Sequence, residues 1–406
     1  MSFKYIKVKT KGQIEGEKLL VPKLRFKEFN NQWRKIKLKD ISTDISYGMN
    51  SAATEYDGFN KYIRITDIDE ETSLYNNNPV SPSGNLYDKF LVKDNDILFA
   101  RTGASTGKAY LYNKTDGKLY FAGFLIRANI KKDYNSRFIF EQTKLGKYNN
   151  WVKIMSIRSG QPGINSIEYG NYEFSITHID EQKKIANVIE LVNKKIELQN
   201  RKIEALKIYK KGLMQKLINS NNCEEKRISE FGTIITGTTP SKLIQSYWHN
   251  GTIVWVTPSD ITESKDIYNS HDMLTPDGLK AGRFVPAGSI LITCIASIGK
   301  NAILKVDGSC NQQINAIIPN KNFNADYLYY LFELKKDYLQ STAGTSATSI
   351  INKTSFEKLV FKIHNIEQQN EYSKILNCLE SKIETEKHKF KKLTLLKKSL
   401  LQQMFI

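Results

Sequence analysis

The segment ARTGASTGKAYL, residues 100–111, combines the residue types that a phosphate-binding loop uses. Two glycines, small hydroxylated residues and a lysine follow the apolar run DILFA, residues 96–100. A Walker loop places four residues between its glycines and a Ser or Thr after the lysine, where the hydroxyl holds magnesium. Here the spacing is one residue short, and Ala109 follows Lys108. The segment therefore does not predict an ATP site.

Other catalytic patterns are missing from the sequence as well. It has no Asn/Asp-Pro-Pro-aromatic motif or Gly-rich cofactor loop of a methyltransferase, and TPDGLK (275–280) is a poor match to a nuclease core. The cysteines are far apart and have no histidine at ligand spacing, which argues against a zinc site and fits a reducing compartment. They are Cys223, Cys294, Cys310 and Cys378. We expect a non-catalytic chain that binds no metal and no cofactor.

The charge balance points to a polyanionic partner. The 406 residues include 60 Lys and Arg against 42 Asp and Glu, which gives a net charge of +18. A surplus of this size is typical of proteins that bind nucleic acid, although a generally Lys-rich proteome would also produce it. The sequence has no apolar signal core and no run of about 18 apolar residues. We expect a soluble, cytoplasmic protein.

The chain contains an internal repeat. The 40 or so residues that end at Ile218 resemble those that end at Ile406: both begin with Glu-Gln, both contain KIE, and KKGLMQKL corresponds to KKSLLQQM. The offset is 187 residues, after one inserted residue near the Glu-Gln pair. Weaker similarities relate YIRITDI (62–68) to IVWVTPSDI (253–261), and the opening segment to TCIASIGKNAIL (293–304). The order is therefore globular unit, helix, globular unit, helix.

Both repeated segments show the heptad pattern of long coiled-coil helices. Eight of the ten seam positions are apolar in each copy, and the two polar ones fall at the same places. In the first copy the two seam rows are Ile185, Val192, Gln199, Leu206, Leu213 and Ile189, Ile196, Ile203, Lys210, Leu217. In the second they are Tyr372, Leu379, Glu386, Leu393, Leu400 and Leu376, Ile383, Phe390, Lys397, Met404.

We expect the two helices to pair in antiparallel orientation. A register in which paired residue numbers sum to 596 places Gln199 opposite Lys397 and Lys210 opposite Glu386, so that no buried polar group lacks a partner. The alternative is that these polar residues lie at the solvated edge of the seam. An overlap of about 30 residues would span roughly 45 Å, or about 13 base pairs. Two modules on such a spacer could contact DNA about one helical turn apart.

The globular units combine short strands with a few helices, so the predicted class is α+β. Helices are expected at 136–150 and 325–340, where Tyr329, Tyr330 and Phe332 should be core residues. Each unit also contains polar loops rich in Ser, Thr, Gly, Asn and Gln, a composition suited to contacts with phosphates and base edges. The loops are 45–58, 158–166, 235–242 and 343–354. Surface loops without a special role are the alternative for any one of them.

Together, these features resemble the DNA specificity subunit of type I restriction–modification systems. The resemblance rests on VPKLRFKEFNNQWRKIKLKDI (21–41), DILFARTGASTGK, SGQPGINS, ITGTTPSK, WVTPSDI and the two Glu-Gln helix starts. It implies two repeated α/β target recognition domains separated by two long antiparallel coiled-coil helices, with an internal pseudo-twofold repeat. The expected boundaries are 1–30 for an N-terminal segment, 31–178 and 223–364 for the recognition domains, and 179–222 and 365–406 for the helices.

The resemblance further implies a non-catalytic subunit that reads a bipartite, asymmetric site in double-stranded DNA. Its helices would set the distance between the half-sites and dock two methyltransferase subunits, through which restriction/translocase subunits join. S-adenosylmethionine, ATP and magnesium would belong to those partners. A specificity subunit serving a fused nuclease–methyltransferase, or a coiled-coil scaffold that binds no DNA, are the alternatives.

The candidate DNA-binding residues lie in the polar loops and in the two Gly-Lys turns. For the first domain they are Tyr47, Asn50, Ser51, Arg101, Ser105, Lys108, Arg158 and Gln161. For the second they are Thr238, Thr239, Lys242, Ser259, Ser297, Lys300, Thr345 and Ser346. Lys108 and Lys300 are assigned to DNA phosphates, and Gly107 and Gly299 to the backbone geometry of their turns. The first domain departs from the second in having ISYGMNSAAT where the second has Gly-Thr-Thr-Pro.

Overall fold

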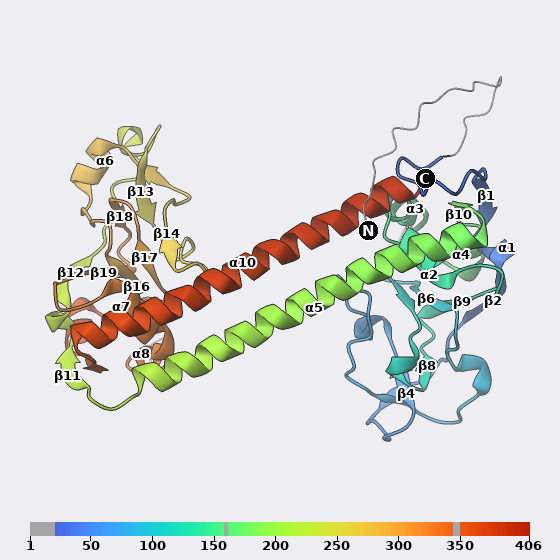
Figure 1. Ribbon diagram of the computed structural model, residues 1–406, viewed down its shortest axis with the longest axis horizontal. Coiled ribbons are helices and arrows are strands. Elements are labelled where there is room, and N and C mark those ends of the chain that lie inside the picture. Colours follow the sequence, from blue (N-terminus) through green and yellow to red (C-terminus); the bar gives the residue numbers. More distant parts are fainter. Residues whose placement is uncertain (1–20, 158–160, 344–349) are drawn as a thin grey trace. The chain divides into compact units, whose positions relative to one another are not determined.

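The computed structural model describes residues 21–157, 161–343 and 350–406. The chain forms two compact units, one made of Met1–Leu198 with Phe390–Ile406 and the other of Gln199–Lys389. Two long helices, α5 (Ile179–Ile218) and α10 (Ile366–Met404), contribute residues to both units (Figure 1). Among the described residues, no helix is both long enough and apolar enough to cross a membrane.

The first unit is built on an antiparallel sheet with the strand order β2-β9-β6-β7. Alternate residues of β6 enter two different cores: Ile97 and Phe99 pack toward the helices, while Leu98 and Ala100 face a smaller core under β4 and β8. Strands β1 and β10 pair at the two ends of the domain. The strands are β1 (Arg34–Lys37), β2 (Ser42–Tyr47), β3 (Ala53–Thr54), β4 (Lys61–Ile63), β5 (Ser81–Pro82), β6 (Asp96–Ala100), β7 (Ala109–Leu111), β8 (Leu119–Phe121), β9 (Leu125–Ile130) and β10 (Glu173–Ile176). The short helices are α1 (Leu38–Ile41), α2 (Ser136–Gln142), α3 (Gly146–Met155) and α4 (Ser166–Gly170).

The second unit repeats this arrangement with the sheet order β12-β19-β16-β17-β14. Its central strand β16 also divides its side chains between two cores, with Ile290 and Ile292 on one face and Leu291 on the other. The strands are β11 (Glu224–Arg227), β12 (Gly232–Thr236), β13 (Ile253–Val256), β14 (Asp266–Ile267), β15 (Met273–Leu274), β16 (Ile290–Thr293), β17 (Asn301–Leu304), β18 (Gly308–Cys310), β19 (Ile314–Pro319) and β20 (Val360–Ile363). The short helices are α6 (Pro276–Ala281), α7 (Ala325–Leu334), α8 (Lys336–Ser341) and α9 (Lys353–Glu357).

The α+β class and the internal repeat predicted from the sequence are confirmed. Strands β2, β6, β7 and β9 have counterparts of the same pairing in β12, β16, β17 and β19. The parallel pair β4–β8 likewise corresponds to β13–β18. Tyr329, Tyr330 and Phe332 are buried, as expected. The single helices expected at 136–150 and 325–340 are each divided into two, α2 with α3 and α7 with α8.

A buried glutamine explains why a Gln near the start of the long helix recurs. Gln182 accepts a hydrogen bond from the Asn135 N–H at 3.0 Å and donates to the Thr177 carbonyl at 2.7 Å. Asn135 in turn caps α2 by accepting from the Phe138 N–H. The amide therefore links the first turn of α5 to both the preceding strand and the start of α2.

The second unit has the same pair of hydrogen bonds, which we call the glutamine clamp. Gln369 accepts from the Asn324 N–H at 2.9 Å and donates to the His364 carbonyl at 2.8 Å. Gln182 thus corresponds to Gln369 at the offset of 187, so the residue that we expected to be inserted near the Glu-Gln pair is absent. By the same clamp, the counterpart of His364 is Thr177 rather than His178.

The predicted heptad seam is confirmed in both helices. All ten seam positions of α5 and all ten of α10 are buried or half-buried. The antiparallel orientation also holds within the second unit, where Gln199 donates to Glu386 and Lys210, further along α5, contacts Glu380, earlier in α10. The proposed register is wrong, however, because Lys210 meets Glu380 instead of Glu386, and the amide of Gln199 binds Glu386.

The register differs because residues beside the seam supply partners that the heptad pattern leaves out. Glu386 is buried and accepts from Gln199 at 2.6 Å, from Lys202 at 2.9 Å and from Lys389 at 3.0 Å. The ammonium of Lys210 also lies over the ring of Tyr330, 5.4 Å from its centroid. In the first unit, burial raises the pKa of Glu141 in α2, and the positive charge of Lys397 opposes that shift.

We predict that Glu386 makes stability depend on pH in the acid range. Its hydrogen bonds from Gln199, Lys202 and Lys389 lower the pKa from 4.5 to about 2. The folded state is therefore favoured by the carboxylate above pH 4.5, and this contribution is lost as the pH falls through the folded pKa. Glu386→Gln should melt at a lower temperature than the wild type at pH 7, and the difference should shrink as the pH falls from 4.5 toward 2.

The measurement is thermal unfolding across this pH range, with Glu371→Gln, an exposed carboxylate of the same helix, as the control. A Glu386→Gln variant whose pH dependence equals that of the wild type would contradict the assignment.

Candidate DNA interface

The loop after strand β2 is fixed by backbone hydrogen bonds to the turn between β8 and β9. The Gly48 N–H donates to the Leu125 carbonyl at 3.1 Å, and the Met49 N–H donates to the Phe121 carbonyl at 2.8 Å. A Cβ atom on Gly48 would lie 2.2 Å from the Ala122 carbonyl oxygen, which is closer than these atoms can approach. Glycine is required here because two backbones meet.

The loop after β12 is fixed in the same way in the second unit. The Gly237 N–H donates to the Ile314 carbonyl at 3.0 Å, and the Thr238 N–H donates to the Cys310 carbonyl at 2.9 Å. A Cβ atom on Gly237 would lie 2.1 Å from the Asn311 carbonyl oxygen. ISYGMNSAAT and the Gly-Thr-Thr-Pro segment thus share one glycine-dependent conformation, although their other residues differ.

A buried aromatic side chain supports each of these loops. The Tyr62 hydroxyl donates to the Met49 carbonyl at 2.7 Å, and the Trp255 Nε1–H donates to the Thr238 carbonyl at 3.0 Å. These residues belong to YIRITDI and IVWVTPSDI, so the similarity of the two segments reflects a shared support for the loop. The name loop frame is used below for the hydrogen bonds at Gly48 and Met49, those at Gly237 and Thr238, and the aromatic donors Tyr62 and Trp255.

The aspartates of these two segments also have one role. Asp67 accepts from the Arg64 N–H at 2.9 Å, and Asp260 accepts from the Thr257 N–H at 2.8 Å. In the first unit Asp67 additionally forms a bidentate ion pair with the Arg64 guanidinium, at 2.9 and 2.8 Å. This ion pair raises the pKa of Arg64. The carboxylate therefore holds the residue that follows strand β4 or β13.

Arg101 follows strand β6 and is held beside Tyr47. Its guanidinium carbon lies 4.8 Å from the centre of the Tyr47 ring, within the range of a cation–π interaction. The Tyr47 hydroxyl accepts from the Ser166 N–H at 3.1 Å, which anchors the ring. Burial raises the pKa of Tyr47, but the hydrogen bond from Ser166 and the nearby Arg101 outweigh that effect and lower it.

These elements enclose an open hollow of about 620 Å³ in the first unit. Four predicted residues line it together, Tyr47, Asn50, Ser51 and Arg101. Arg64 and Phe124 also line it, and sequence reasoning did not identify either of them. The hollow thus combines two guanidinium groups with aromatic and amide side chains, which is the chemistry needed to read the edges of bases.

Comparison with known proteins identifies the family. A model described as the type I restriction modification DNA specificity domain matches residues 30–207 and again residues 220–395. The chain belongs to this family. The two matches support the internal repeat, and the two parts are called the first and second specificity domains below.

Two curated relatives are similar over one part of the chain. A type I restriction enzyme specificity subunit of Methanocaldococcus jannaschii is 33% identical over 168 residues, 40% of this chain and 39% of its own length. An Escherichia coli type I restriction enzyme specificity subunit is 30% identical over 162 residues, 38% of this chain and 40% of its own length. The chain thus spans about two fifths of the length of these relatives.

Two solved structures share this fold over nearly the whole chain. The S subunit of a type I restriction–modification system from M. genitalium is 15% identical with a TM-score of 0.62, and the match covers 95% of this chain and 99% of that one. A structure from a study of complex assembly in a type I R-M system has a TM-score of 0.60 at 13% identity, covering 96% of this chain and 99% of that one.

In the second specificity domain, the predicted Lys242 sits against two tryptophans. Its ammonium lies 3.6 Å from the Trp248 ring centre and 4.9 Å from that of Trp255, and it forms a 2.5 Å ion pair with Asp272. The hydrogen bond from Lys242 lowers the pKa of Asp272. A cation held between aromatic faces keeps its position, so Lys242 is presented at a defined place on the loop.

Other predicted residues of this domain serve the local structure of their loops. The Thr239 hydroxyl donates to the Gln312 side chain, and the Ser259 hydroxyl shares a 2.7 Å hydrogen bond with Thr257. The Thr238 hydroxyl is buried and has no hydrogen-bond partner among the described residues, so the loop uses this residue through its backbone. Ser297 accepts from the Thr293 hydroxyl through its carbonyl.

The segment ARTGASTGKAYL (100–111) forms a turn between β6 and β7, and its counterpart links β16 to β17. Gly107 and Gly299 have φ values of 89° and 83°, as their assignment to turn geometry predicted. A Cβ atom would lie 2.6 Å from Val152 at Gly107 and 2.9 Å from Lys336 at Gly299, so each turn also packs against a helix. Glycine is therefore needed at both positions for two separate reasons.

Lys108 is less available than its assignment to DNA phosphates requires. Its side chain is 13% exposed, donates to the Ile68 carbonyl at 3.0 Å and pairs with Glu70 at 3.3 Å. A phosphate contact would require the ammonium to leave that carbonyl, and the assignment stays a prediction. Its counterpart Lys300 is half-buried.

The remaining candidates of the first domain are partly described. Gln161 is exposed, and its side-chain nitrogen would lie 3.3 Å from a Cβ atom added to Gly103. Ser51 donates to the Ser83 carbonyl at 2.5 Å, and Ser105 accepts from the Lys108 N–H at 3.0 Å. Three candidates, Arg158, Thr345 and Ser346, lie outside the described residues.

Two missed residues of the hollow had weak signals in the sequence. Arg64 lies within YIRITDI and Phe124 lies within KLYFAGFLIRANI (118–130), and both segments are rich in apolar residues, as buried strands are. The structure ends β8 at Phe121 and starts β9 at Leu125, so Phe124 falls in the turn and is 63% exposed. Gly123 between these runs was the available sign of that turn.

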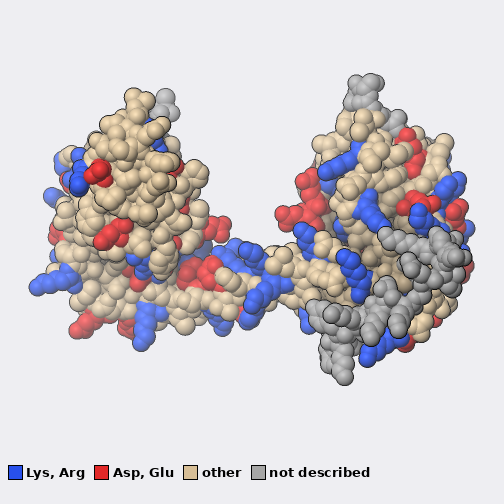
Figure 2. Space-filling view, turned by 90° about the horizontal axis from the view of Figure 1, so that it is seen from above, with Lys and Arg blue, Asp and Glu red and all other residues tan. Residues whose placement is uncertain are grey.

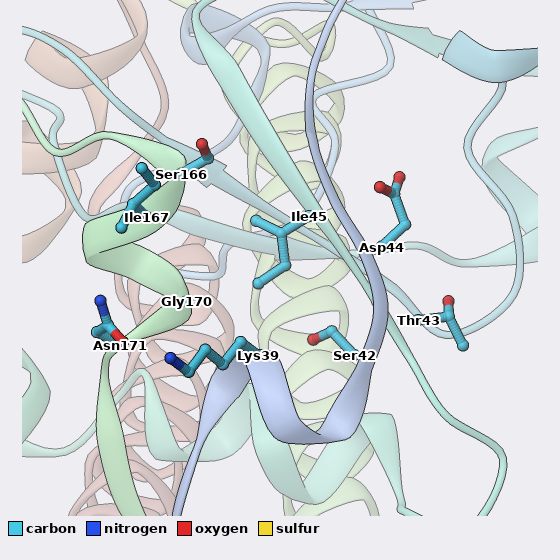
Figure 3. A pocket seen from close by; sticks show the side chains of 9 residues that line it. All are labelled: Lys39, Ser42, Thr43, Asp44, Ile45, Ser166, Ile167, Gly170 and Asn171. Carbon is cyan, nitrogen blue, oxygen red and sulfur yellow. The ribbon is translucent and has the colours of Figure 1, made fainter.

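A second, shallower groove of about 340 Å³ lies between β2 and α4 (Figure 3). Lys39 and Ile45 border the space next to Gly170, whereas Asp44 points away on the other side of its strand. Asp44 is bound there by Arg127 at 2.7 Å. None of the predicted DNA-binding residues lines this groove. Within residues 21–157, 161–343 and 350–406, no group of three His, Cys, Asp or Glu side chains could hold a metal ion.

We predict that the first specificity domain cannot tolerate a side chain at Gly48. Gly48→Ala should lower the free energy of unfolding by about 3 kcal/mol or more, because the new methyl group collides with a backbone carbonyl rather than with a flexible side chain. Gly146→Ala is the matched control, since a Cβ atom there would have nothing within 4 Å. Denaturant unfolding of both variants tests this, and equal stabilities would show that the close approach is not required.

Proposed function

We propose that this chain is the sequence-recognition subunit of a type I restriction–modification complex in the cytoplasm. Each specificity domain would contact one half of a bipartite, asymmetric site in double-stranded DNA, and the chain itself would catalyse no reaction. The observation that carries this proposal is the loop frame, which occurs once in each domain and fixes the polar loop that follows β2 or β12. Two such loops in one chain fit a site read in two parts.

The charge distribution supports binding to DNA phosphates. The net charge is +18, and Lys and Arg side chains crowd the exposed parts of the long helices in Figure 2. On α5, Lys194, Lys195 and Arg201 are exposed, and on α10 Lys391 and Lys392 are exposed. Contacts of this kind position a protein on DNA without reading sequence, and they make affinity depend strongly on salt.

The proposal assigns methylation and cleavage to partner chains. Methyltransferase subunits would supply S-adenosylmethionine chemistry, and restriction/translocase subunits, joined through them, would use ATP and magnesium. We propose that the helices dock two methyltransferase subunits, and the exposed side chains of α5 and α10 support this.

Helix α5 carries an exposed stripe that does not belong to its seam. Ala205, Ile208, Tyr209 and Gly212 have the i, i+3, i+4, i+7 spacing of a single helix face. Ile208 and Tyr209 are 73% and 62% exposed. Gly212 destabilises a helix by roughly 1 kcal/mol relative to Ala, yet a Cβ atom there would meet nothing within 4 Å. A partner backbone that approaches closely at Gly212 would explain its presence.

Helix α10 repeats the centre of this stripe at the offset of 187. Leu395 and Leu396 correspond to Ile208 and Tyr209 and are 57% and 47% exposed, and Ser399 occupies the place of Gly212. Lysines flank both pairs, Lys207 and Lys211 on α5 and Lys391, Lys392 and Lys398 on α10. Each stripe therefore suits an apolar ridge bordered by acidic side chains, and two equivalent stripes suit two copies of one partner.

We predict that the chain, purified with the methyltransferase encoded beside it, directs adenine methylation to a bipartite motif. Mapping methylated adenines in DNA treated with the complex should give two defined half-sites separated by unspecified bases. A continuous motif, or methylation without sequence preference, would exclude the proposed function. Binding by the complex should also weaken steeply with salt, because phosphate contacts release counterions.

We predict that a charge in either stripe weakens the docking of one methyltransferase copy. Tyr209→Glu and Leu396→Glu should each lower the affinity for one copy by roughly 30-fold, as expected for a central apolar anchor worth on the order of 2 kcal/mol. The double variant should lose both copies. Analytical ultracentrifugation of the mixed subunits gives the stoichiometry.

Ile154→Glu, at a residue in α3 that is 70% exposed, is the control and should leave both copies bound. Full assembly of the double variant would show that the partners dock elsewhere.

A further inference from the structure

The two specificity domains share a second backbone arrangement, at the end of their central strands. The Arg101 N–H donates to the Phe124 carbonyl at 3.0 Å, and the Arg101 carbonyl accepts from the Ile164 N–H at 2.9 Å. In the second domain the Cys294 N–H donates to the Gln313 carbonyl at 2.8 Å, and the Cys294 carbonyl accepts from the Ile351 N–H at 2.9 Å. Arg101 with Phe124 therefore corresponds to Cys294 with Gln313.

Identical backbone positions thus carry side chains of unrelated chemistry. Arg101 is a cation at the wall of the hollow, whereas Cys294 is buried, and its burial raises the pKa to about 12 so that the thiol stays neutral. Phe124 is an exposed aromatic ring, whereas Gln313 is a half-buried amide that accepts from Asn311 at 3.1 Å. Because the fold forms with either pair, packing alone does not require an arginine and an exposed phenylalanine.

The surroundings of Arg101 suit a base edge better than a phosphate. Arg101 is half-buried and its guanidinium lies over the Tyr47 ring, which limits the directions in which its donors can point. Phe124, whose backbone is bonded to Arg101, exposes 63% of its surface, and an apolar ring gains nothing from a hydrated phosphate. A planar guanidinium matches the O6 and N7 acceptors of guanine, and an apolar ring matches the methyl group of thymine.

We infer that Arg101 reads a guanine and Phe124 the methyl group of a neighbouring thymine, in the half-site of the first specificity domain. Tyr47 is a positioning residue that holds the guanidinium in place. Asn50 lines the same hollow. This inference rests on the proposed function, because it assigns two bases of a DNA site that the proposed function requires.

The test maps methylated adenines with the complete complex of this chain and its methyltransferase. One half-site of the wild-type motif should contain a guanine next to a thymine. Arg101→Ala and Arg101→Lys should each reduce the preference for that guanine roughly 10- to 100-fold, since both lose the two parallel donors of the guanidinium. Phe124→Ala should relax the neighbouring thymine, and the other half-site should stay unchanged in all three variants.

Arg34→Ala, which removes an exposed arginine outside the hollow, is the control and should leave the motif intact. A wild-type motif without guanine in either half-site would overturn the inference while leaving the bipartite function in place. An unchanged motif with uniformly weaker methylation of every site would also overturn it, because Arg101 would then contact phosphate. If the Arg101→Ala variant does not assemble, the wild-type motif and the Arg101→Lys variant still test the inference. If the wild type shows no bipartite motif at all, the proposed function itself is rejected.

Discussion

A buried glutamine amide bonds the first turn of each long helix to the specificity domain before it, and this contact fixes the start of a short helix, α2 or α7, against the long one. Gln182 and Gln369 each accept from the N–H of the residue that caps a short helix and donate to a carbonyl at the end of a strand. The amide does both because its oxygen accepts and its NH2 group donates, whereas a carboxylate or an apolar side chain here would leave a buried backbone group unpaired. Helix α2, placed in this way, packs on β6 and β7. Since Arg101 follows β6, the clamp at the helix start sets where the hollow lies relative to the first turns of α5.

The seam of the long helices shows how the two copies meet one requirement with different residues. A lysine in an apolar seam needs a nearby negative charge, because burying an unpaired cation is costly. Lys210 finds it on the facing helix, in Glu380, while for Lys397 the carboxylate of Glu141 comes from α2 of the globular part. The residue of α5 that corresponds to Glu380 is Asn193, and its side chain donates to Glu141 at 3.4 Å. The lysine is therefore present in both copies, but its carboxylate partner is not in the same place. For Lys210 the carboxylate lies on the facing helix, whereas for Lys397 it lies in α2 and the facing helix has an asparagine instead.

The sequence was sufficient to predict the elements that depend on periodicity. The repeat, the two long helices and their seam follow from such patterns, whereas the antiparallel orientation was expected from the need to pair the polar seam residues. The register did not follow, because Lys202 and Glu380 lie outside the heptad rows and the pairing of seam residues could not account for them. The hollow was predicted only in part, since Tyr47, Asn50, Ser51 and Arg101 lie in polar segments, whereas Arg64 and Phe124 lie within apolar ones. Their position depends on where a strand stops, and composition alone does not determine this.

The loop frame explains how this fold persists with little sequence in common. Its hydrogen bonds join backbone N–H and carbonyl groups, and its one strict side-chain requirement is a glycine at position 48 or 237. Even the supporting aromatic residue is a tyrosine in one domain and a tryptophan in the other. Solved structures with 13% and 15% identity can therefore share the fold over 95% or more of the chain. Side chains at the rim of the frame, such as Arg101, carry none of these bonds. On the proposed function, a domain built in this way can change the bases that it reads while the backbone that presents them stays the same.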